Sequence, residues 1–150
     1  MASEKKSNAA KLAEIAFTLL GDCAKKEVQF AKRFGLTTAE FHCLRFINSG
    51  EVINNKDLAN RLNLSPGRLT RIINGLVQKK YVTRNLDPDN RRSLRVALSK
   101  KGEQMVAQLK DAYLSIHEEI LSDIDPKIHK ELINGMTHLL SALRNWINKT

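Results

Sequence analysis

Two helix start signals that lie close together constrain the middle of this chain more than any other feature. Asn54 suits the start of a short helix, and Ser65 followed by Pro66 suits the start of a second one. Their side chains can accept hydrogen bonds from free backbone N–H groups, and proline fits a first helical turn. Asn63 lies between the two signals and tolerates the positive φ of a tight turn. The segment therefore predicts two helices joined by a tight turn, the second over residues 66–80, which is helix-turn-helix geometry.

Positive charge is concentrated around this segment. The chain of 150 residues has 25 Lys or Arg against 16 Asp or Glu, a net charge of +9. Residues 57–101 contain eleven of the basic residues and three acidic ones, and the remainder is near balance with 14 and 13. Such localised charge is typical of a surface that binds a polyanion. A membrane surface is a weaker interpretation, because no strongly apolar helix face flanks the basic residues.

Composition excludes several other classes of protein. A hydrophobic fraction of 42% is enough for a core, and the length suits one domain or a small domain with added helices. No apolar run approaches the roughly 18 residues that span a bilayer. The N-terminal segment lacks the apolar centre of a signal peptide, so we expect a cytoplasmic protein with no membrane contact. Cys23 and Cys43 are too widely spaced for a disulfide framework or a CxxC metal motif, and no metal or cofactor is expected.

Helical periodicity predicts further helices on both sides of the basic segment. Thr37 and Glu40 form a capping-box pattern, and Gly35 suits a left-handed helix end. Turn-rich residues 85–93 separate two short runs that are typical of a β-hairpin. The strands are expected over residues 81–84 and 94–98, and the helices over about residues 8–33, 38–50, 54–62, 66–80, 100–124 and 126–147. The predicted fold is therefore mostly α with a small β-hairpin wing.

Double-stranded DNA is the expected polyanion, because a helix-turn-helix can place its second helix in the major groove. Arginine there can bond guanine or a phosphate, and threonine can contact a thymine methyl. Arginines near the tip of a hairpin can enter the neighbouring minor groove. The plainer interpretation is a solvated polar helix face, which the coincidence of turn, helix and hairpin disfavours. The candidate DNA-binding residues are Ser65, Pro66, Gly67, Arg68, Thr70, Arg71 and Asn74 on the helix, and Arg84, Asn90, Arg91, Arg92 and Arg95 on the wing.

Several motifs together resemble the MarR family (multiple antibiotic resistance regulators). They are Asp57-Leu58-Ala59, Leu62-Asn63-Leu64-Ser65, Leu69-Thr70-Arg71 and the segment from Asp87 to Gly102. The resemblance implies a homodimer of winged helix-turn-helix subunits that binds a pseudo-palindromic operator, with Arg92 in the minor groove and Thr70 and Arg71 as recognition-helix contacts. Two departures stand out: Asn90 replaces a usual Asp that orients the wing arginine, and Tyr81 replaces a common Gly.

The apolar faces of the terminal segments independently favour a dimer. A small winged core over residues 38–98 cannot cover the apolar faces of both residues 12–34 and residues 128–147. Association with a second chain is the simplest way to bury them. The alternative is a helical hairpin that folds back on its own domain. We expect residues 1–37 and 99–150 to be dimerisation helices and residues 38–98 to be the winged helix-turn-helix DNA-binding domain.

Regulation is less readable than DNA binding. By resemblance, a small aromatic or anionic effector could bind near His42, Arg45, Tyr113 and His117, although packed or solvated side chains are the plainer interpretation. Oxidation of Cys23 or Cys43, or zinc at scattered ligands, has weaker support. The expected function is a dimeric, sequence-specific DNA-binding transcriptional regulator, in particular an effector-responsive repressor. The alternative is a sequence-tolerant architectural nucleic-acid-binding protein. An enzyme is not expected, because no catalytic residue set appears.

Overall fold

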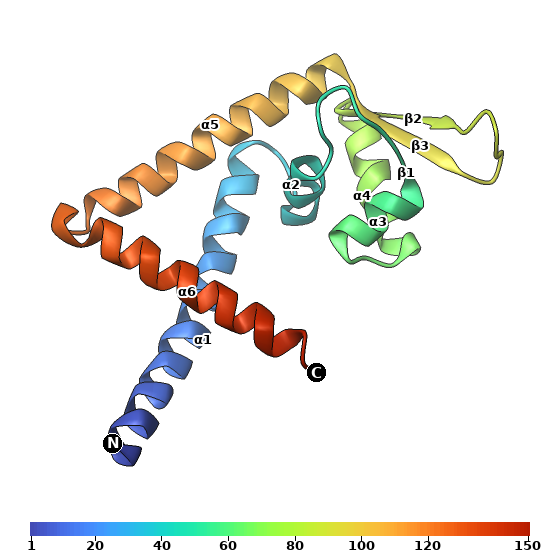
Figure 1. The fold of residues 1–150 in the computed structure, drawn as a ribbon. Coiled ribbons are helices and arrows are strands. Elements are labelled where there is room, and N and C mark those ends of the chain that lie inside the picture. The colour runs from blue at the N-terminus through green and yellow to red at the C-terminus, as the bar shows by residue number, and fades with distance from the viewer. The chain divides into compact units, whose positions relative to one another are not determined.

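A computed structural model describes residues 1–150 and is mostly helical with one small sheet (Figure 1). This confirms the predicted fold class. In chain order the elements are α1 (Ala2–Arg33), α2 (Thr38–Arg45), β1 (Val52–Asn54), α3 (Asn55–Leu62), α4 (Pro66–Gln78), β2 (Val82–Leu86), β3 (Leu94–Leu98), α5 (Lys100–Ser122), a short 3-10 helix η1 (Pro126–Ile128) and α6 (His129–Ile147).

The chain forms two compact units, residues 1–109 and residues 110–150, and the boundary lies within α5. The first unit contains the sheet and the two helices of the helix-turn-helix, α3 and α4. The second unit contains the end of α5, η1 and α6. No helix combines the length and the apolar character that crossing a membrane requires.

The sheet has three antiparallel strands in the order β1-β3-β2. The hairpin of β2 and β3 is confirmed, but β2 runs over Val82–Leu86 instead of residues 81–84. Tyr81 still belongs to the helix end, since its N–H donates to the carbonyl of Leu76. Sequence reasoning missed β1, because three residues are too few to show alternation. The strand is defined only by its antiparallel pairing with β3, in which Ile53 lies opposite Val96.

The core of the first unit is formed by the end of α1, α2, the two helices of the helix-turn-helix and the sheet. Phe30, near the end of α1, packs against Phe41 of α2 with ring centroids 5.0 Å apart. Most earlier residues of α1 are exposed and none is buried, so only its last turns belong to this core. Other fully buried side chains are Leu44, Ile47, Leu58, Leu69, Ile73, Leu76 and Val96.

Local capping explains the helix starts. Thr37 and Glu40 form the predicted capping box, with hydrogen bonds of 3.1 and 3.0 Å. The side chain of Asn54 accepts from the N–H of Asp57 at 2.8 Å, as expected for the cap of α3. Asn63 has φ of 53°, which confirms the left-handed turn between α3 and α4.

Several helix boundaries differ from the prediction. The first helix begins at Ala2 instead of Asn8, since Ala and Lys favour helix and Glu4 suits the positive end of the helix dipole. The second helix ends at Arg45, well before Gly50, because the carbonyl of Phe46 is bound by the Arg61 side chain from α3. The chain then turns into β1.

Three other helix ends also differ. The recognition helix α4 ends at Gln78. The residue with positive φ at this helix end is Lys80, at 65°, and not Tyr81, which replaces the family's common Gly. In the second unit, the ring Nε2 of His129 lies 2.9 and 2.8 Å from the carbonyl oxygens of Leu121 and Ile124. Carbonyl oxygens only accept, so Nε2 carries the hydrogen and donates to both. These contacts join the two helix ends: α5 ends at Ser122, and α6 starts at His129 after the 3-10 turn η1.

Candidate nucleic-acid interface

The start of α4 is built to present polar residues. The hydroxyl of Ser65 accepts from the N–H of Arg68 at 3.4 Å, and the hydroxyl of Thr70 donates to the carbonyl of Pro66 at 2.9 Å. Leu69 and Ile73 are buried on the opposite face of the helix. The exposed face carries the remaining predicted residues Gly67, Arg68, Arg71 and Asn74. The structure therefore brings the seven predicted helix residues together at one exposed end and face.

Arg68 and Arg71 keep their charges free, because neither guanidinium forms an ion pair with a carboxylate. They lie three residues apart, which places them about one helical turn from each other. Uncompensated arginines on an exposed helix face suit a phosphate or a guanine edge.

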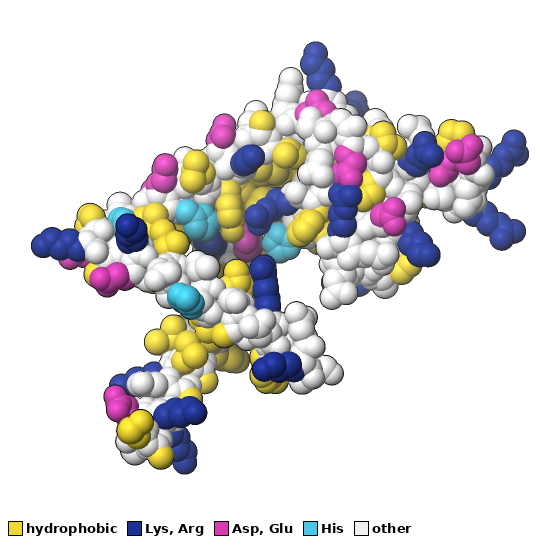
Figure 2. All heavy atoms as spheres, viewed as in Figure 1, with side chains coloured by type: hydrophobic (Ala, Val, Ile, Leu, Met, Phe, Trp, Pro, Cys, Tyr) yellow, Lys and Arg dark blue, Asp and Glu magenta, His cyan; other side chains and the backbone are white.

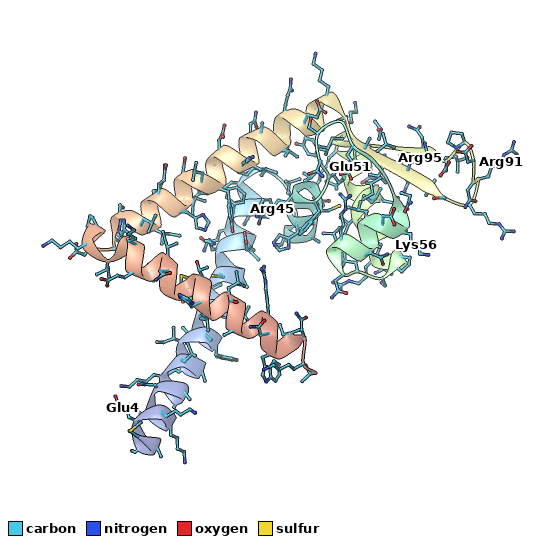
Figure 3. All side chains as sticks on the ribbon, viewed as in Figure 1. Glu4, Arg45, Glu51, Lys56, Arg91 and Arg95 are labelled. Atoms are coloured by element: carbon cyan, nitrogen blue, oxygen red, sulfur yellow. The ribbon has the colours of Figure 1, made fainter.

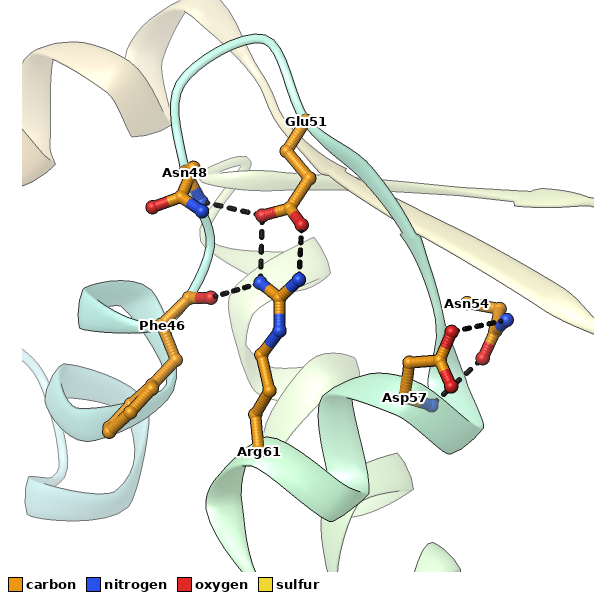
Figure 4. A network of polar contacts seen from close by, with 6 residues as sticks. All are labelled: Phe46, Asn48, Glu51, Asn54, Asp57 and Arg61. Atoms are coloured by element: carbon orange, nitrogen blue, oxygen red, sulfur yellow. Dashed lines mark hydrogen bonds and ion pairs between the residues drawn. The ribbon is translucent and has the colours of Figure 1, made fainter.

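Other arginines and lysines of the basic segment have structural partners instead. Arg61 of α3 binds both carboxylate oxygens of Glu51 at 2.9 and 2.5 Å and also donates to the carbonyl of Phe46 at 3.1 Å (Figure 4). Hydrogen bonding from Arg61 is the main reason that the pKa of Glu51 is lowered to about 2. This network fixes α3 to the loop before β1, so Arg61 acts as a structural residue of the helix-turn-helix.

Lys79, at the end of α4, is likewise neutralised. Its Nζ lies 2.6 Å from a carboxylate oxygen of Glu40, which is 6% exposed, and donates to the carbonyl of Gly35 at 2.8 Å. Gly75 faces the same carboxylate, which occupies the place that a β-carbon would take. The C-terminal end of α4 is therefore locked against the start of α2.

The wing tip is organised by side chains that cap its turns. The side-chain oxygen of Asn90 accepts from the N–H of Arg92 at 3.1 Å, and a carboxylate oxygen of Asp87 accepts from the N–H of Asp89 at 2.9 Å. Asp87 also forms an ion pair with Arg95 at 3.1 Å. Asn90 therefore shapes the backbone before Arg92 without pairing with its charge.

Arg91 and Arg92 are exposed and have no carboxylate partner. Figure 3 shows Arg91 extending away from the end of the hairpin, whereas Arg95 lies further back along it. In the space-filling view, Lys and Arg side chains project from this part of the first unit (Figure 2). The wing thus presents free positive charge at its tip, and Arg84, farther from the tip, is bonded to Asn74 of α4.

The four predicted effector residues lie on two elements. On α2, the ring centroid of His42 is 5.4 Å from that of Phe41, and the guanidinium carbon of Arg45 is 5.8 Å from the same Phe41 ring. On the second-unit part of α5, the rings of Tyr113 and His117 lie 4.5 Å apart. Each pair is a local cluster of its own unit, and a role in effector binding stays a prediction.

Cys43 lacks the features of an oxidant sensor. It is fully buried, and burial is the main reason that its pKa is raised from 9.0 to about 12, with the charge of Glu40 adding to the effect. A thiol with such a pKa is protonated at neutral pH, so it is a poor nucleophile.

We expect Cys43 to resist alkylation at pH 7.5 until the protein unfolds. Because the folded-state pKa exceeds the unfolded value, this thiol's contribution to stability is complete below about pH 9 and is lost as pH rises toward 12. The free energies of unfolding of the wild type and of Cys43→Ala should therefore approach each other between pH 9 and 11. Mass spectrometry of labelled Cys23→Ala protein reads Cys43 alone, and fast labelling of the native protein would contradict the assignment.

Comparisons with known proteins agree on one family. A sequence model described as the MarR family matches residues 36–94. The HTH-type transcriptional regulator SarZ of Staphylococcus saprophyticus is 30% identical over 125 residues, which cover 83% of this chain and 80% of that protein. SarZ of Staphylococcus epidermidis is 32% identical over 128 residues, covering 83% and 78%.

Solved structures share the fold. A mutant of MepR from S. aureus superposes with a TM-score of 0.77 at 17% identity, covering 87% of this chain and 97% of that one. A MarR mutant from E. coli gives 0.74 at 22% identity, with 86% and 96% covered. A second S. aureus MepR mutant, bound to an oligodeoxyribonucleotide, gives 0.64 at 16% identity, with 88% and 97% covered.

Proposed function

Because this chain belongs to the MarR family, we propose that two copies bind a pseudo-palindromic operator and repress transcription. Members of this family are DNA-binding transcriptional regulators and not enzymes. The sequence prediction of a DNA-binding transcriptional regulator is confirmed. The dimer, the operator, the contacting residues and the response to an effector belong to the proposal. So does a cytoplasmic location, since the protein must reach the DNA that it regulates.

The observation that carries the proposal is the uncompensated charge on two adjoining elements. Arg68 and Arg71 on α4 are free of carboxylates, as are Arg91 and Arg92 on the wing, while Arg61, Lys79 and Arg95 are neutralised within the fold. A rigid helix and a hairpin with free arginines suit adjacent major and minor grooves.

Uncovered apolar surface supports the dimer. No residue of α6 is buried, and its large apolar side chains lie in solvent: Leu143 is 51% exposed and Trp146 is 65% exposed. On α1, Phe17 is 79% exposed. Monomeric proteins rarely expose such large apolar surfaces, so burial of these side chains against a second copy of the chain is the simplest arrangement. The other large exposed apolar side chains of these two helices are Leu12, Ile15, Leu19, Leu20 and Val28 on α1, and Ile133, Met136, Leu139, Leu140 and Ile147 on α6.

The effector part of the proposal is a small aromatic or anionic ligand that changes operator affinity. His42 and Arg45 on α2, and Tyr113 and His117 on α5, offer aromatic rings beside groups that can bind an anion. Repression fits a protein that occupies a promoter through a two-site contact.

A DNase footprint on the DNA upstream of the protein's own gene tests the proposal. Two protected half-sites should lie one DNA turn apart, about 34–36 Å between centres. Equal protection of all sequences would instead support the sequence-tolerant architectural protein, and competition with single strands and RNA would show the preferred nucleic acid.

Arg71→Ala should weaken operator binding by about 1–3 kcal/mol and relax the preference at one base position, provided that Arg71 reads a base edge. Titration of the operator and of single-base variants of it measures both effects. A uniform loss across all variants would instead assign Arg71 to a phosphate. Unchanged affinity would remove Arg71 from the interface.

A further inference from the structure

Asn74 of α4 is held by a residue of the wing. Nη1 of Arg84, on β2, donates to the side-chain oxygen of Asn74 across 2.5 Å. A guanidinium has only donors, so the amide oxygen, and not the amide nitrogen, must face Arg84. This bond joins the recognition helix to the hairpin and decides the orientation of an exposed amide.

Asn74 lies on the helix face that the proposed function places in the major groove. It follows Arg71 by three residues, Thr70 by four and Gly67 by seven, and these spacings share one face of a helix. Asn74 is exposed, and its amide nitrogen forms no hydrogen bond within the protein. The amide nitrogen is thus free to donate two hydrogen bonds.

Arg84 is positioned independently of α4. It pairs with Val96 in the β2–β3 ladder, and Val96 is fully buried in the core. Arg84 is partly buried as a residue, and its guanidinium has no carboxylate partner. The sheet therefore fixes the backbone that carries Arg84, and the Arg84–Asn74 bond gives the Asn74 amide one orientation before any DNA arrives.

We infer that Arg84 is a specificity-determining residue, which makes Asn74 a hydrogen-bond donor and selects guanine at the base that Asn74 meets. The inference rests on the proposed function, because it requires α4 in the major groove. A free asparagine commonly reads adenine through two bonds, in which its oxygen accepts from N6 and its nitrogen donates to N7. Here Arg84 already binds that oxygen and uses one of its two lone pairs, so the two-bond pairing with adenine would compete with the Arg84 bond.

The edges of the bases then decide the preference. Adenine would bring its donor N6 amino group to an amide whose oxygen is already bound to Arg84, and only its N7 could accept from the Asn74 nitrogen. Guanine offers acceptors at both O6 and N7, whereas cytosine offers only a donor. Thymine offers one acceptor beside a methyl group. Guanine is consequently the edge that the Arg84–Asn74 pair fits best.

Selection of bound sequences from a randomised duplex pool tests this assignment, using full-length protein. The wild type should enrich guanine at one position of each half-site, by about tenfold over adenine, and Asn74→Ala should lose that preference. Arg84→Met frees the amide oxygen, so the guanine-to-adenine ratio should fall to within about twofold of unity. These ratios correspond to the usual discrimination of one good base contact.

Two variants separate orientation from charge. Arg84→Lys keeps a group that only donates, so it should restore the guanine preference. Lys56→Met removes one exposed positive charge from α3 and should leave the base preference unchanged. Replacing the selected guanine by 7-deazaguanine should weaken the wild type and leave Asn74→Ala unaffected.

The outcomes are distinguishable. An adenine preference in the wild type, a guanine preference that survives Arg84→Met, or no position that depends on Asn74 would each overturn the inference while the proposed function stands. Failure of the wild type to enrich any sequence would overturn the proposed function, and the inference with it.

Discussion

Replacing Gly102 with alanine should destabilise the first unit by about 3 kcal/mol or more, because the added methyl group has no space. Gly102 is buried in the first turn of α5, and the backbone carbonyl of Tyr81 occupies the place of its β-carbon. That carbonyl also accepts from the N–H of Ser99 at 3.0 Å. Relief would require α5 to move away from the end of α4. Urea denaturation at equal protein concentrations measures the change, since unfolding of a dimer depends on concentration.

Gly67→Ala is the matched control. Gly67 lies in the first turn of α4, and no atom lies within 4 Å of the position that a β-carbon would take. Alanine favours helix over glycine by up to about 1 kcal/mol, so this variant should be as stable as the wild type or more stable. If Gly102→Ala unfolded at the same urea concentration as Gly67→Ala, the close contact between Gly102 and the Tyr81 carbonyl would be contradicted.

Raising salt from 50 to 200 mM should weaken operator binding by about 10³–10⁵, the range for a protein that neutralises six to ten phosphates. Within residues 57–101, six basic side chains have no carboxylate or other bonding partner: Arg68, Arg71, Lys80, Arg91, Arg92 and Lys100. Two copies would double that number, so even partial contact reaches this range. Fluorescence anisotropy over a salt series gives the slope of log affinity against log salt.

The double variant Arg91→Ala/Arg92→Ala should make that slope shallower by about one for each lost phosphate contact. The matched control is Lys5→Ala/Lys6→Ala, which removes the same charge from exposed positions at the start of α1. Equal slopes for the wild type and the wing variant would mean that the wing tip does not contact DNA.

Capping and turn residues made the helix-turn-helix predictable. Asn54, Asn63 and Ser65 each act through backbone groups at most three residues away, so their geometry hardly depends on the rest of the fold. The wing was also predictable, because residues 85–93 are rich in turn formers between two strand-like runs. The strand β1 was not, since pairing with β3 across some forty residues defines it.

The ion pairs and hydrogen bonds of charged side chains could not be predicted from the sequence either. Glu40 was predicted as a cap, and the structure gives its carboxylate a second partner in Lys79. Gly75 was a clue, because a glycine inside a helix costs stability and often marks a close approach. The bond between Asn74 and Arg84 had no such signal, since both residues suited direct DNA contact.

The amino-acid pattern alone decided that this chain forms a basic winged helix-turn-helix between long apolar helices, because caps, periodicity and net charge are local properties. Which of the eleven basic residues remain free was decided by tertiary contacts alone. Glu51 and Glu40 lie outside the basic segment and still neutralise Arg61 and Lys79, so charge counted along the chain overstates what the surface presents. Ion pairs form between residues that folding brings within a few ångströms, and distance along the chain does not reveal them.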